Sequence, residues 1–387
     1  MIAQRFLFAG AVNGIALFVL GALHVPLTFL TFLLVLIASI WSAAAMPPLS
    51  VTPKAAAWLP HSILALVLLI LATITPLTDY DGVATWIPKA KAIAREASIT
   101  GPFFRGERGL NLHNHYPLLI PLNDAAIMRL TGTIDDRAVR WLYVLIPLAA
   151  LLAISEGRAW ICFGIVLLPQ VIAAPEGGVL SAYNDLAVAA FFGMAVYALD
   201  RSEFAGVWLA ALILTKNEGI ALAIASIIAA AIARKLRVRD LWLPAVAFIA
   251  LIAWRAQIPD AYDERYSVLV RELPSHANRF FYAVVALLRA AIDLKTWGLF
   301  WPAVLVAMLI ARKRALLPIV AIAIAFASYA IAFTVTSWSI DELAKVAANR
   351  LLVQLVIASV ACFGVRRPQE TVSKGGTDTL VCAPRAG

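Results

Sequence analysis

Charged side chains are scarce in this chain. Of its 387 residues only 14% are Asp, Glu, Lys or Arg, whereas 62% are hydrophobic, and the mean hydropathy is +0.87. A soluble protein of this length needs far more charge to cover its surface. The composition therefore excludes an ordinary soluble protein and predicts an all-α, polytopic membrane helix bundle, whose structural unit is the membrane-spanning helix.

Cysteine is also rare, and its placement excludes two kinds of site. Cys162 and Cys362 lie within apolar runs, and Cys382 lies in the C-terminal tail. No spacing suggests a zinc site, and we expect no structural disulfide. The net charge is +9. In a membrane protein such an excess of Lys and Arg reports topology, so nucleic acid is not an expected partner.

Long apolar runs are abundant. A helix needs roughly 20 apolar residues to cross about 30 Å of hydrocarbon. On that basis we expect about twelve transmembrane helices within one domain, residues 1–365. The polar remainder, 366–387, is expected to be a disordered cytoplasmic tail. The expected spans are 6–22, 27–45, 59–76, 138–154, 159–175, 183–199, 204–215, 219–233, 241–257, 297–311, 316–336 and 348–365.

Short basic loops predict the orientation of the bundle. Compact basic clusters occur at 233–240, 311–314 and 365–368, each directly beside the end of a span. The positive-inside rule places all three clusters, and with them both termini, in the cytoplasm. The loops 77–137 and 258–296 then lie outside the cell membrane.

Each external loop contains an amphipathic segment. In the first loop, Trp86 lies on the apolar face of a predicted helix and Lys89 on the basic face. In 278–295, Arg279 and Arg289 share one narrow stripe. We expect both segments to be interfacial helices, with the basic side chains toward water or lipid headgroups.

Two aspartates, Asp79 and Asp81, lie where the third span reaches the outer surface. One of them could be a helix N-cap, a position that aspartate favours. Alternatively, a carboxylate at the boundary between water and lipid could take a proton from an incoming hydroxyl or bind a cation. The sequence leaves both interpretations open.

Two further polar groups lie in external segments. His113, His115 and Tyr116 close the first loop. The two histidines are either polar loop residues in contact with substrate or metal ligands, although no third ligand is evident. Tyr183 and Asp185 open a later span, where Asp185 could again be an N-cap.

Two more groups place charge beside or inside apolar runs. Lys216 and Glu218 interrupt an apolar region, and a break in the helix at Asn217–Gly219 would let them meet or point into a site. Lys345 and Arg350 begin the last span. Arginine suits a phosphate because its guanidinium donates two parallel hydrogen bonds, whereas the alternative is contact with lipid headgroups.

All five groups map to the same side of the membrane. One outward-facing site that takes a lipid substrate explains them more economically than five separate anchors. The main alternative is a membrane transporter of a lipid-linked or small anionic substrate. Transporters usually place their site near the midplane, between repeated halves, and this sequence shows no internal repeat.

Five segments, taken in order, resemble the GT-C superfamily of integral-membrane glycosyltransferases, which use polyprenyl-phosphate-linked sugar donors. Relatives in that superfamily include protein O-mannosyltransferases and lipid A aminoarabinose transferases. The likeness covers roughly residues 60–360, and it departs from the family pattern at Leu118, where a second proline is common. The segments are YDGVATWIPKAKAI (80–93), HNHYPLLIPLNDA (113–125), YNDLAVAAFF (183–192), LTKNEG (214–219) and NRLLVQL (349–355).

The resemblance implies a reaction and its catalytic group. Asp81, with Asp79 as the second candidate, would be the general base on an acceptor hydroxyl. That hydroxyl would attack the anomeric carbon of the donor, and polyprenyl phosphate would leave with inversion of configuration. The donor and its phosphate would be bound by Lys216, Glu218, Lys345 and Arg350.

The resemblance also implies substrate contacts and a location. Membrane lipid and an unidentified glycan, lipid or protein acceptor would be the other partners, in the bacterial inner membrane with the active site facing the exterior. Some branches of the family need a divalent cation, and no ligand cluster in this sequence decides that point. The expected acceptor or donor contacts are Trp86, Lys89, His113, His115, Tyr116, Tyr183 and Asp185.

Overall fold

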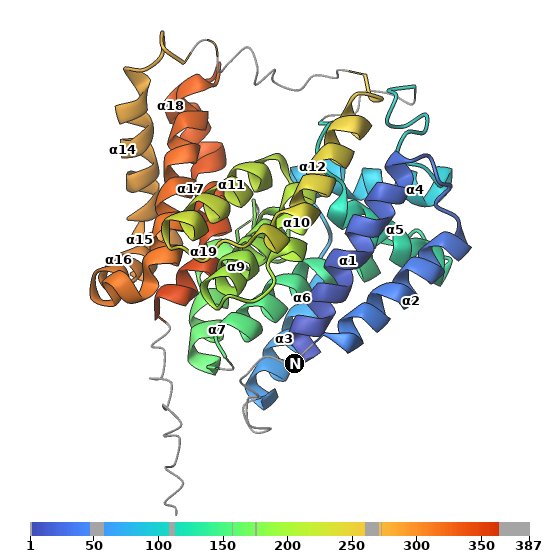
Figure 1. Ribbon diagram of the computed structural model, residues 1–387, viewed down its shortest axis with the longest axis horizontal. Coiled ribbons are helices and arrows are strands. Elements are labelled where there is room, and N and C mark those ends of the chain that lie inside the picture. The colour runs from blue at the N-terminus through green and yellow to red at the C-terminus, as the bar shows by residue number, and fades with distance from the viewer. Residues whose placement is uncertain are drawn as a thin grey trace, which may run out of the picture.

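The computed structural model is helical, and the part of the chain that it describes contains no strand (Figure 1). The predicted all-α class is therefore confirmed. The description covers residues 2–46, 58–107, 113–156, 158–174, 176–259, 271 and 273–363. The expected tail 366–387 and the basic cluster 365–368 lie outside these residues.

Four described segments are long and apolar enough to cross a membrane. They are α1 (Ile2–Ala22), α6 (Asp136–Ile154), the stretch Phe300–Val335 that contains α16 and α17, and the stretch Ile340–Phe363 that ends in α19. Shorter apolar helices fill other expected spans. They are α2 (Phe29–Ala45), α3 (Trp58–Ile74), α10 (Gly206–Thr215) and α11 (Asn217–Ile232).

The remaining helices complete the bundle. The expected span 159–175 is divided in two, because Leu168 precedes a proline and takes an extended conformation that ends α7 before α8 begins. The other bounds are α4 (Ile87–Glu96), α5 (Leu119–Thr131), α7 (Ala159–Val166), α8 (Pro169–Ile172), α9 (Asp185–Asp200), α12 (Trp242–Arg255), α14 (Arg279–Ala291), α15 (Leu294–Trp297), α16 (Phe300–Ala311), α17 (Leu316–Val335), α18 (Ile340–Leu343) and α19 (Asn349–Phe363).

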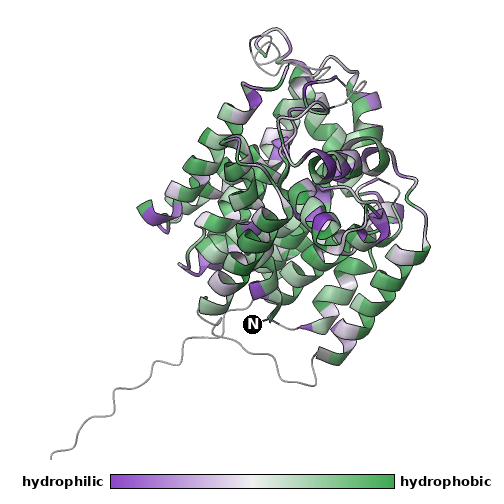
Figure 2. Cartoon of the chain, turned by 90° about the vertical axis from the view of Figure 1, so that its right-hand side faces the viewer, coloured by the Kyte–Doolittle hydropathy of each residue, from purple (hydrophilic) through white to green (hydrophobic). Residues whose placement is uncertain are grey.

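Helix α9 is the centre of the bundle. Every residue from Asp185 to Leu199 is buried, and α6, α10, α11, α17 and α19 all pack against it. A helix that is apolar on all sides is stable only when neighbours cover it completely. Hydrophobic residues also predominate along most of the helices, as Figure 2 shows. The N-terminal end of this central helix is where the polar site described below is built.

The chain breaks between α10 and α11. Lys216 takes an extended conformation, with φ −160° and ψ 161°, between two helical residues. The two helices pack closely beyond the break: a Cβ at Gly219 would lie only 1.9 Å from the carbonyl oxygen of Leu212. Glycine is therefore required at 219, and the close approach fixes the direction in which Lys216 points.

Two π-helical turns flank the site. One covers Gly82–Trp86, immediately after Asp81, and the other covers Ala344–Ala348, just before Arg350. π-Turns are rare and are often found at functional sites. Two parts of the chain far apart in sequence therefore carry the same local irregularity next to a charged side chain.

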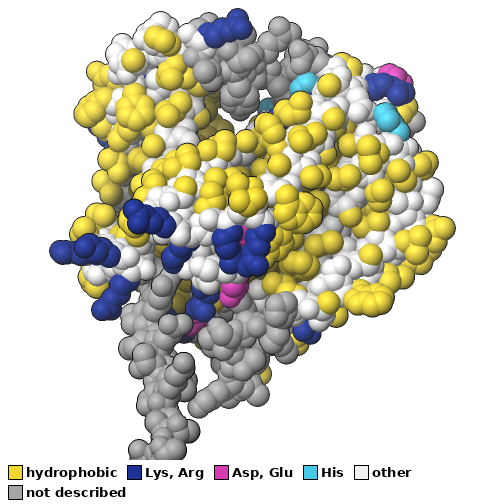
Figure 3. Space-filling view, viewed as in Figure 1, with side chains coloured by type: hydrophobic (Ala, Val, Ile, Leu, Met, Phe, Trp, Pro, Cys, Tyr) yellow, Lys and Arg dark blue, Asp and Glu magenta, His cyan; other side chains and the backbone are white. Residues whose placement is uncertain are grey.

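The two described ends of the chain lie close to one edge of the molecule. In Figure 1 the start of α1 and the end of α19 both lie toward the lower edge. Most Lys and Arg side chains on this face lie in a band toward the same edge, below a broad hydrophobic surface (Figure 3). Helix α14 packs against α17 and α18, and its predicted position in the membrane interface stays a prediction.

Candidate functional site

The centre of the candidate site is Asp185, the first residue of α9. Its side chain is 0% exposed, and three donors surround it. Lys216 Nζ lies 2.8 Å from Oδ1, Gln354 Nε2 lies 2.6 Å from the same oxygen, and Arg350 Nε lies 3.2 Å from Oδ2. The side chain does not cap a helix, because Asn184 occupies the cap position. The N-cap interpretation of Asp185 is therefore wrong.

Arg350 joins two carboxylates. Besides its bond to Asp185, its Nη2 donates to Asp81 Oδ2 at 2.5 Å. The guanidinium also lies over the ring of Tyr183, 4.5 Å from the ring centroid, and the hydroxyl oxygen of Tyr183 accepts from the backbone N–H of Asp81 at 3.2 Å. Arg350 is thus held by charge and by a ring face, in an interior position rather than at lipid headgroups.

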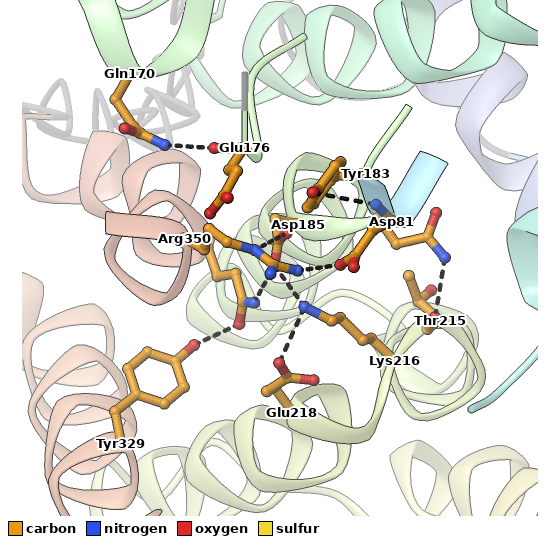
Figure 4. Close-up of polar contacts among 12 residues, drawn as sticks. Asp81, Gln170, Glu176, Tyr183, Asp185, Thr215, Lys216, Glu218, Tyr329 and Arg350 are labelled. Atoms are coloured by element: carbon orange, nitrogen blue, oxygen red, sulfur yellow. Dashed lines mark hydrogen bonds and ion pairs between the residues drawn. The ribbon is translucent and has the colours of Figure 1, made fainter. Parts of the chain in front are cut away.

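Lys216 completes the arrangement. The break before α11 brings its ammonium to 3.0 Å from Glu218 Oε1 as well as to Asp185. A continuous helix would have placed Lys216 and Glu218 on different faces. We call Asp81, Asp185, Lys216, Glu218 and Arg350 the ion cluster; Figure 4 shows these side chains pointing toward one another.

The ion cluster is buried on one side and open on the other. The exposed fractions of the side chains are 0% for Asp185 and 4% for Lys216, but 14% for Asp81, 15% for Arg350 and 25% for Glu218. Charges removed from water are costly unless other charges and hydrogen bonds compensate them. The cluster therefore has a closed base around Asp185 and an accessible edge at Asp81 and Glu218.

Helix α19 and α17 support the base of the cluster. Gln354 lies one turn after Arg350, so both side chains reach Asp185 from the same face of α19. The other end of the Gln354 amide accepts from the hydroxyl of Tyr329, on α17, at 2.8 Å. This chain of hydrogen bonds fixes the rotamer of Gln354 and, through it, the carboxylate that Lys216 and Arg350 share.

A short loop covers the pair of Asp185 and Arg350. Gly177 has φ +81°, and a Cβ there would lie 3.4 Å from Arg350 Cγ and 3.7 Å from Asp185 Oδ2. Ala182, just before Tyr183, takes φ +54°, which is unusual for alanine. A strained backbone of this kind persists only where its surroundings hold it, and such residues gather at functional sites.

Tyr183 differs from an ordinary surface tyrosine. It is buried, and its hydroxyl is a hydrogen-bonding group beside Asp81.

Asp79 does not join the ion cluster. Helical residues begin at Tyr80, and the backbone carbonyl of Asp79 accepts from the N–H of Val83. Burial raises the pKa of the Asp79 carboxyl, and Arg140 nearby opposes that change. Asp79 thus occupies the position that begins this helix, while Asp81 reaches Arg350.

Trp86, Lys89, His113 and Tyr116, which were also predicted to contact the substrate, form a second group of side chains. Trp86 and Tyr116 lie with ring centroids 5.6 Å apart, and His113 stacks on Tyr116 at 4.5 Å. The ammonium of Lys89 lies 5.3 Å from the Trp86 ring and 5.4 Å from the Tyr116 ring, and donates to the carbonyl of His113 at 2.5 Å. Lys89 is only 1% exposed.

The prediction that Lys89 lies on a wet basic face is therefore wrong. The π-turn that ends at Trp86 changes which side chains of this segment share a face, since it adds a residue to the turn. The ring faces and the His113 carbonyl then stabilise the buried ammonium.

His115 links the segment between α4 and α5 to α12 and, through Arg255, to α11. Its Nε2 lies 3.1 Å from the carbonyl of Ile258, and its own carbonyl accepts from Arg255 Nε at 3.0 Å. Arg255 also donates to Asn217 Oδ1 at 2.5 Å. Through Arg255, His115 therefore holds Asn217, the residue next to Lys216, in place.

Lys345, predicted to bind the donor phosphate, lies outside the ion cluster, as Asp79 does. It belongs to the π-turn before Arg350, its side chain is exposed, and it makes no hydrogen bond or ion pair with the residues described. The described residues also contain no group of three or more His, Cys, Asp or Glu side chains that could hold a metal ion.

Several residues of the site were missed by the sequence analysis. Gln354 and Tyr329 are polar groups inside apolar helices, and that isolation is a signal that could have identified them. Arg140 lies outside the ion cluster and donates to the backbone carbonyls of Thr75 and Leu180 at 2.5 and 3.0 Å. Arg140 also donates to the hydroxyl of Thr75 at 3.2 Å. No sequence motif marked Arg140, because its other acceptors are backbone carbonyls.

Comparison with known proteins adds nothing to this geometry: no family model, no curated protein and no solved structure matches the chain.

Proposed function

We propose that the chain is an integral-membrane glycosyltransferase of the GT-C type, which transfers a sugar from a polyprenyl-phosphate donor to an acceptor hydroxyl. The observation that carries the proposal is the bridge from Asp81 through Arg350 to Asp185 and Lys216. It joins one accessible carboxylate to two cations inside an apolar bundle. Such a pairing suits a reaction that needs both a base and a phosphate site.

Arg350 and Lys216 are the groups that would receive the phosphate. Polyprenyl phosphate leaves with negative charge, and preorganised cations stabilise that charge as it develops. Asp185 holds both cations in place and, being fully buried, remains as their counter-charge. Glu218 lies 3.0 Å from Lys216 and would limit where that ammonium can move.

Asp81 is the base in this proposal. Its carboxylate accepts a hydrogen bond from Arg350. A donor phosphate would compete for the same guanidinium, since arginine binds phosphate through two parallel hydrogen bonds. Asp81 would then be free to accept the proton of the acceptor hydroxyl, so that donor binding itself prepares the base.

The reaction then follows as one displacement. The hydroxyl oxygen forms a bond to the anomeric carbon of the sugar, and its proton passes to Asp81. The bond from that carbon to the phosphate oxygen breaks, and its electron pair leaves with polyprenyl phosphate beside Arg350 and Lys216. A single displacement inverts the configuration at the anomeric carbon.

The cluster does not form an evident cation site. Its carboxylates face Arg350 or Lys216 at 2.5–3.2 Å rather than one another. A divalent cation would have to replace a cationic side chain to gain two carboxylate ligands. No step of this mechanism is therefore assigned to a metal.

We further propose about twelve spans, with both termini in the cytoplasm and the site facing outward, as in a bacterial inner-membrane enzyme. Support comes from the apolar helices that occupy most of the expected spans. The start of α1 and the end of α19 lie toward one edge of the molecule, and most basic side chains of one face lie toward the same edge (Figures 1 and 3). This arrangement also supports the proposed orientation.

One observation favours a transporter as a second candidate. The chain is broken at Lys216, and buried charges lie at the break, an arrangement that many transporters use to bind their substrate. A transporter would move the anion without breaking a glycosidic bond. The two functions therefore differ in the fate of the donor.

The deciding experiment supplies the purified protein, in lipid vesicles, with polyprenyl-phosphate sugars labelled in the sugar. Water or an envelope extract is the acceptor. We expect labelled sugar to be released or transferred, with polyprenyl phosphate as the second product. Intact donor that crosses the vesicle membrane without chemical change would support the transporter instead.

A further inference from the structure

A cleft lies along α14, outside the ion cluster. This cleft of about 780 Å³ separates α14 from the segment 337–341, which leads into α18. Arg279, Tyr282, Ala286 and Arg289 line one side of this cleft. Their spacing of three, four and three residues places them on one helix face. We call this cleft the α14 groove; it shares no residue with the ion cluster.

The two arginines of the groove have different surroundings. Arg279 donates to the carbonyls of Thr336 and Trp338, at 2.9 and 2.5 Å, and so braces the opposite wall. Arg289 is exposed and makes no hydrogen bond or ion pair with any described residue. Asp341 is the one carboxylate among the lining residues. The groove therefore carries net positive charge, and Arg289 is available to a ligand.

The rest of the groove is amphipathic. Phe281, Tyr282 and Trp338 line it with exposed fractions of 69%, 64% and 51%. Aromatic side chains offer a large apolar surface to a hydrocarbon chain. Arg279 and Arg289 are ten residues apart, which corresponds to about 15 Å along the helix. A groove of that length can hold the hydrocarbon chain of a ligand that has one charged headgroup.

We propose that the α14 groove binds an anionic phospholipid of the surrounding membrane, with its phosphate on Arg289 and an acyl chain along Tyr282 and Ala286. Charge complementarity identifies the ligand: a guanidinium on an apolar helix bundle needs an anion, and a phosphate oxygen pair matches its geometry. The apolar and aromatic lining requires that this anion carry a hydrocarbon chain. The inference does not depend on the proposed transferase activity.

Native mass spectrometry of the full chain tests this site. The protein is released from nanodiscs of phosphatidylcholine that contain a minor fraction of phosphatidylglycerol, and retained lipids are counted. We expect wild type to retain phosphatidylglycerol selectively and Arg289→Gln to lower that retention about tenfold or more, as the loss of a charge-assisted contact predicts. Asp341→Asn removes the opposing charge of the groove and should raise the retention.

Arg239→Gln is the matched control, because Arg239 is also exposed and lies in the basic cluster 233–240. It should leave the selectively retained lipid in place. Equal retention by wild type and Arg289→Gln would overturn the proposal, as would equal retention of phosphatidylcholine and phosphatidylglycerol by wild type. Binding of inorganic phosphate by a protein that retains no lipid would also contradict it, since the ligand would then be a free anion.

Discussion

Replacing Asp185 by asparagine should destabilise the protein more than any other change in the ion cluster. Asp185→Asn keeps the shape of the side chain but removes its charge. The carboxylate is 0% exposed and accepts from Lys216, Arg350 and Gln354. In the variant, Lys216 and Arg350 lose one of the carboxylates that compensate their charge. The asparagine NH₂ group, itself a donor, also replaces an oxygen that had accepted hydrogen bonds.

The expected cost follows from the contacts. A hydrogen bond to a charged group contributes about 1.5–3 kcal/mol, and such contributions are not additive within one cluster. Breaking a buried ion pair by removing one partner costs about 3–5 kcal/mol. We therefore expect Asp185→Asn to lower the free energy of unfolding by about 3–5 kcal/mol. Asp81→Asn should cost less, because Asp81 has one side-chain ion pair and is 14% exposed.

Thermal unfolding of the purified variants in one detergent and one lipid measures the difference. A loss of this size lowers Tm by several degrees. Glu107→Gln is the control: Glu107 pairs with Arg105 at 2.6 Å, but both side chains are about half exposed, at 53% and 48%, and exposed pairs contribute little. An Asp185→Asn variant that unfolds at the same temperature as Glu107→Gln would refute the reasoning.

Three further predictions concern the surroundings of the cluster. Gly219→Ala should prevent the close contact with Leu212, because the added Cβ would lie 1.9 Å from a carbonyl oxygen; a folded variant with an unchanged Tm would contradict this. Burial raises the pKa of Asp79, so folding favours its protonated form. The stability that this protonation contributes to the folded state is lost as the pH rises from about 4 through the raised pKa. The Tm of Asp79→Asn relative to wild type should therefore increase between about pH 4 and pH 7, and a constant difference would contradict the burial of Asp79. Tyr183→Leu should lower Tm more than Tyr183→Phe, because only phenylalanine keeps a ring face beneath the Arg350 guanidinium at 4.5 Å; equal losses would show that the ring face contributes nothing.

Much of the site could be predicted because its charged residues lie in or beside apolar runs, where charge is rare. Charged residues in apolar runs are expensive, so Lys216, Glu218 and Arg350 stood out without any knowledge of their partners. The sequence suggested a helix break at 217–219 as the way for Lys216 and Glu218 to meet. The structure places the break at Lys216 itself, and α11 already begins at Asn217. The choice of Asp81 over Asp79 relied on the resemblance, and the structure brings Asp81, not Asp79, to Arg350.

Other features depend on contacts that no local pattern contains. The burial of Lys89 follows from two rings and a carbonyl, one ring and the carbonyl belonging to a segment more than twenty residues away. The division of the span 159–175 was missed because its apolar composition outweighed Pro169. The support that Gln354 gives to Asp185 joins residues that are 169 positions apart.

The most direct test of Asp81 as the base compares Asp81→Asn with Glu107→Gln, two carboxyl-to-amide changes in the same segment between α3 and α5. Turnover of a labelled polyprenyl-phosphate sugar is measured beside equilibrium binding of that donor, with Tm recorded to show that each variant is folded. The account predicts that Asp81→Asn binds the donor at least as well as wild type, because Arg350 is released for the phosphate, yet turns over at least about 100-fold more slowly, as the loss of a general base predicts. Glu107→Gln should match wild type in both. Turnover by a folded Asp81→Asn variant at the wild-type rate would contradict the assignment of Asp81 as the base.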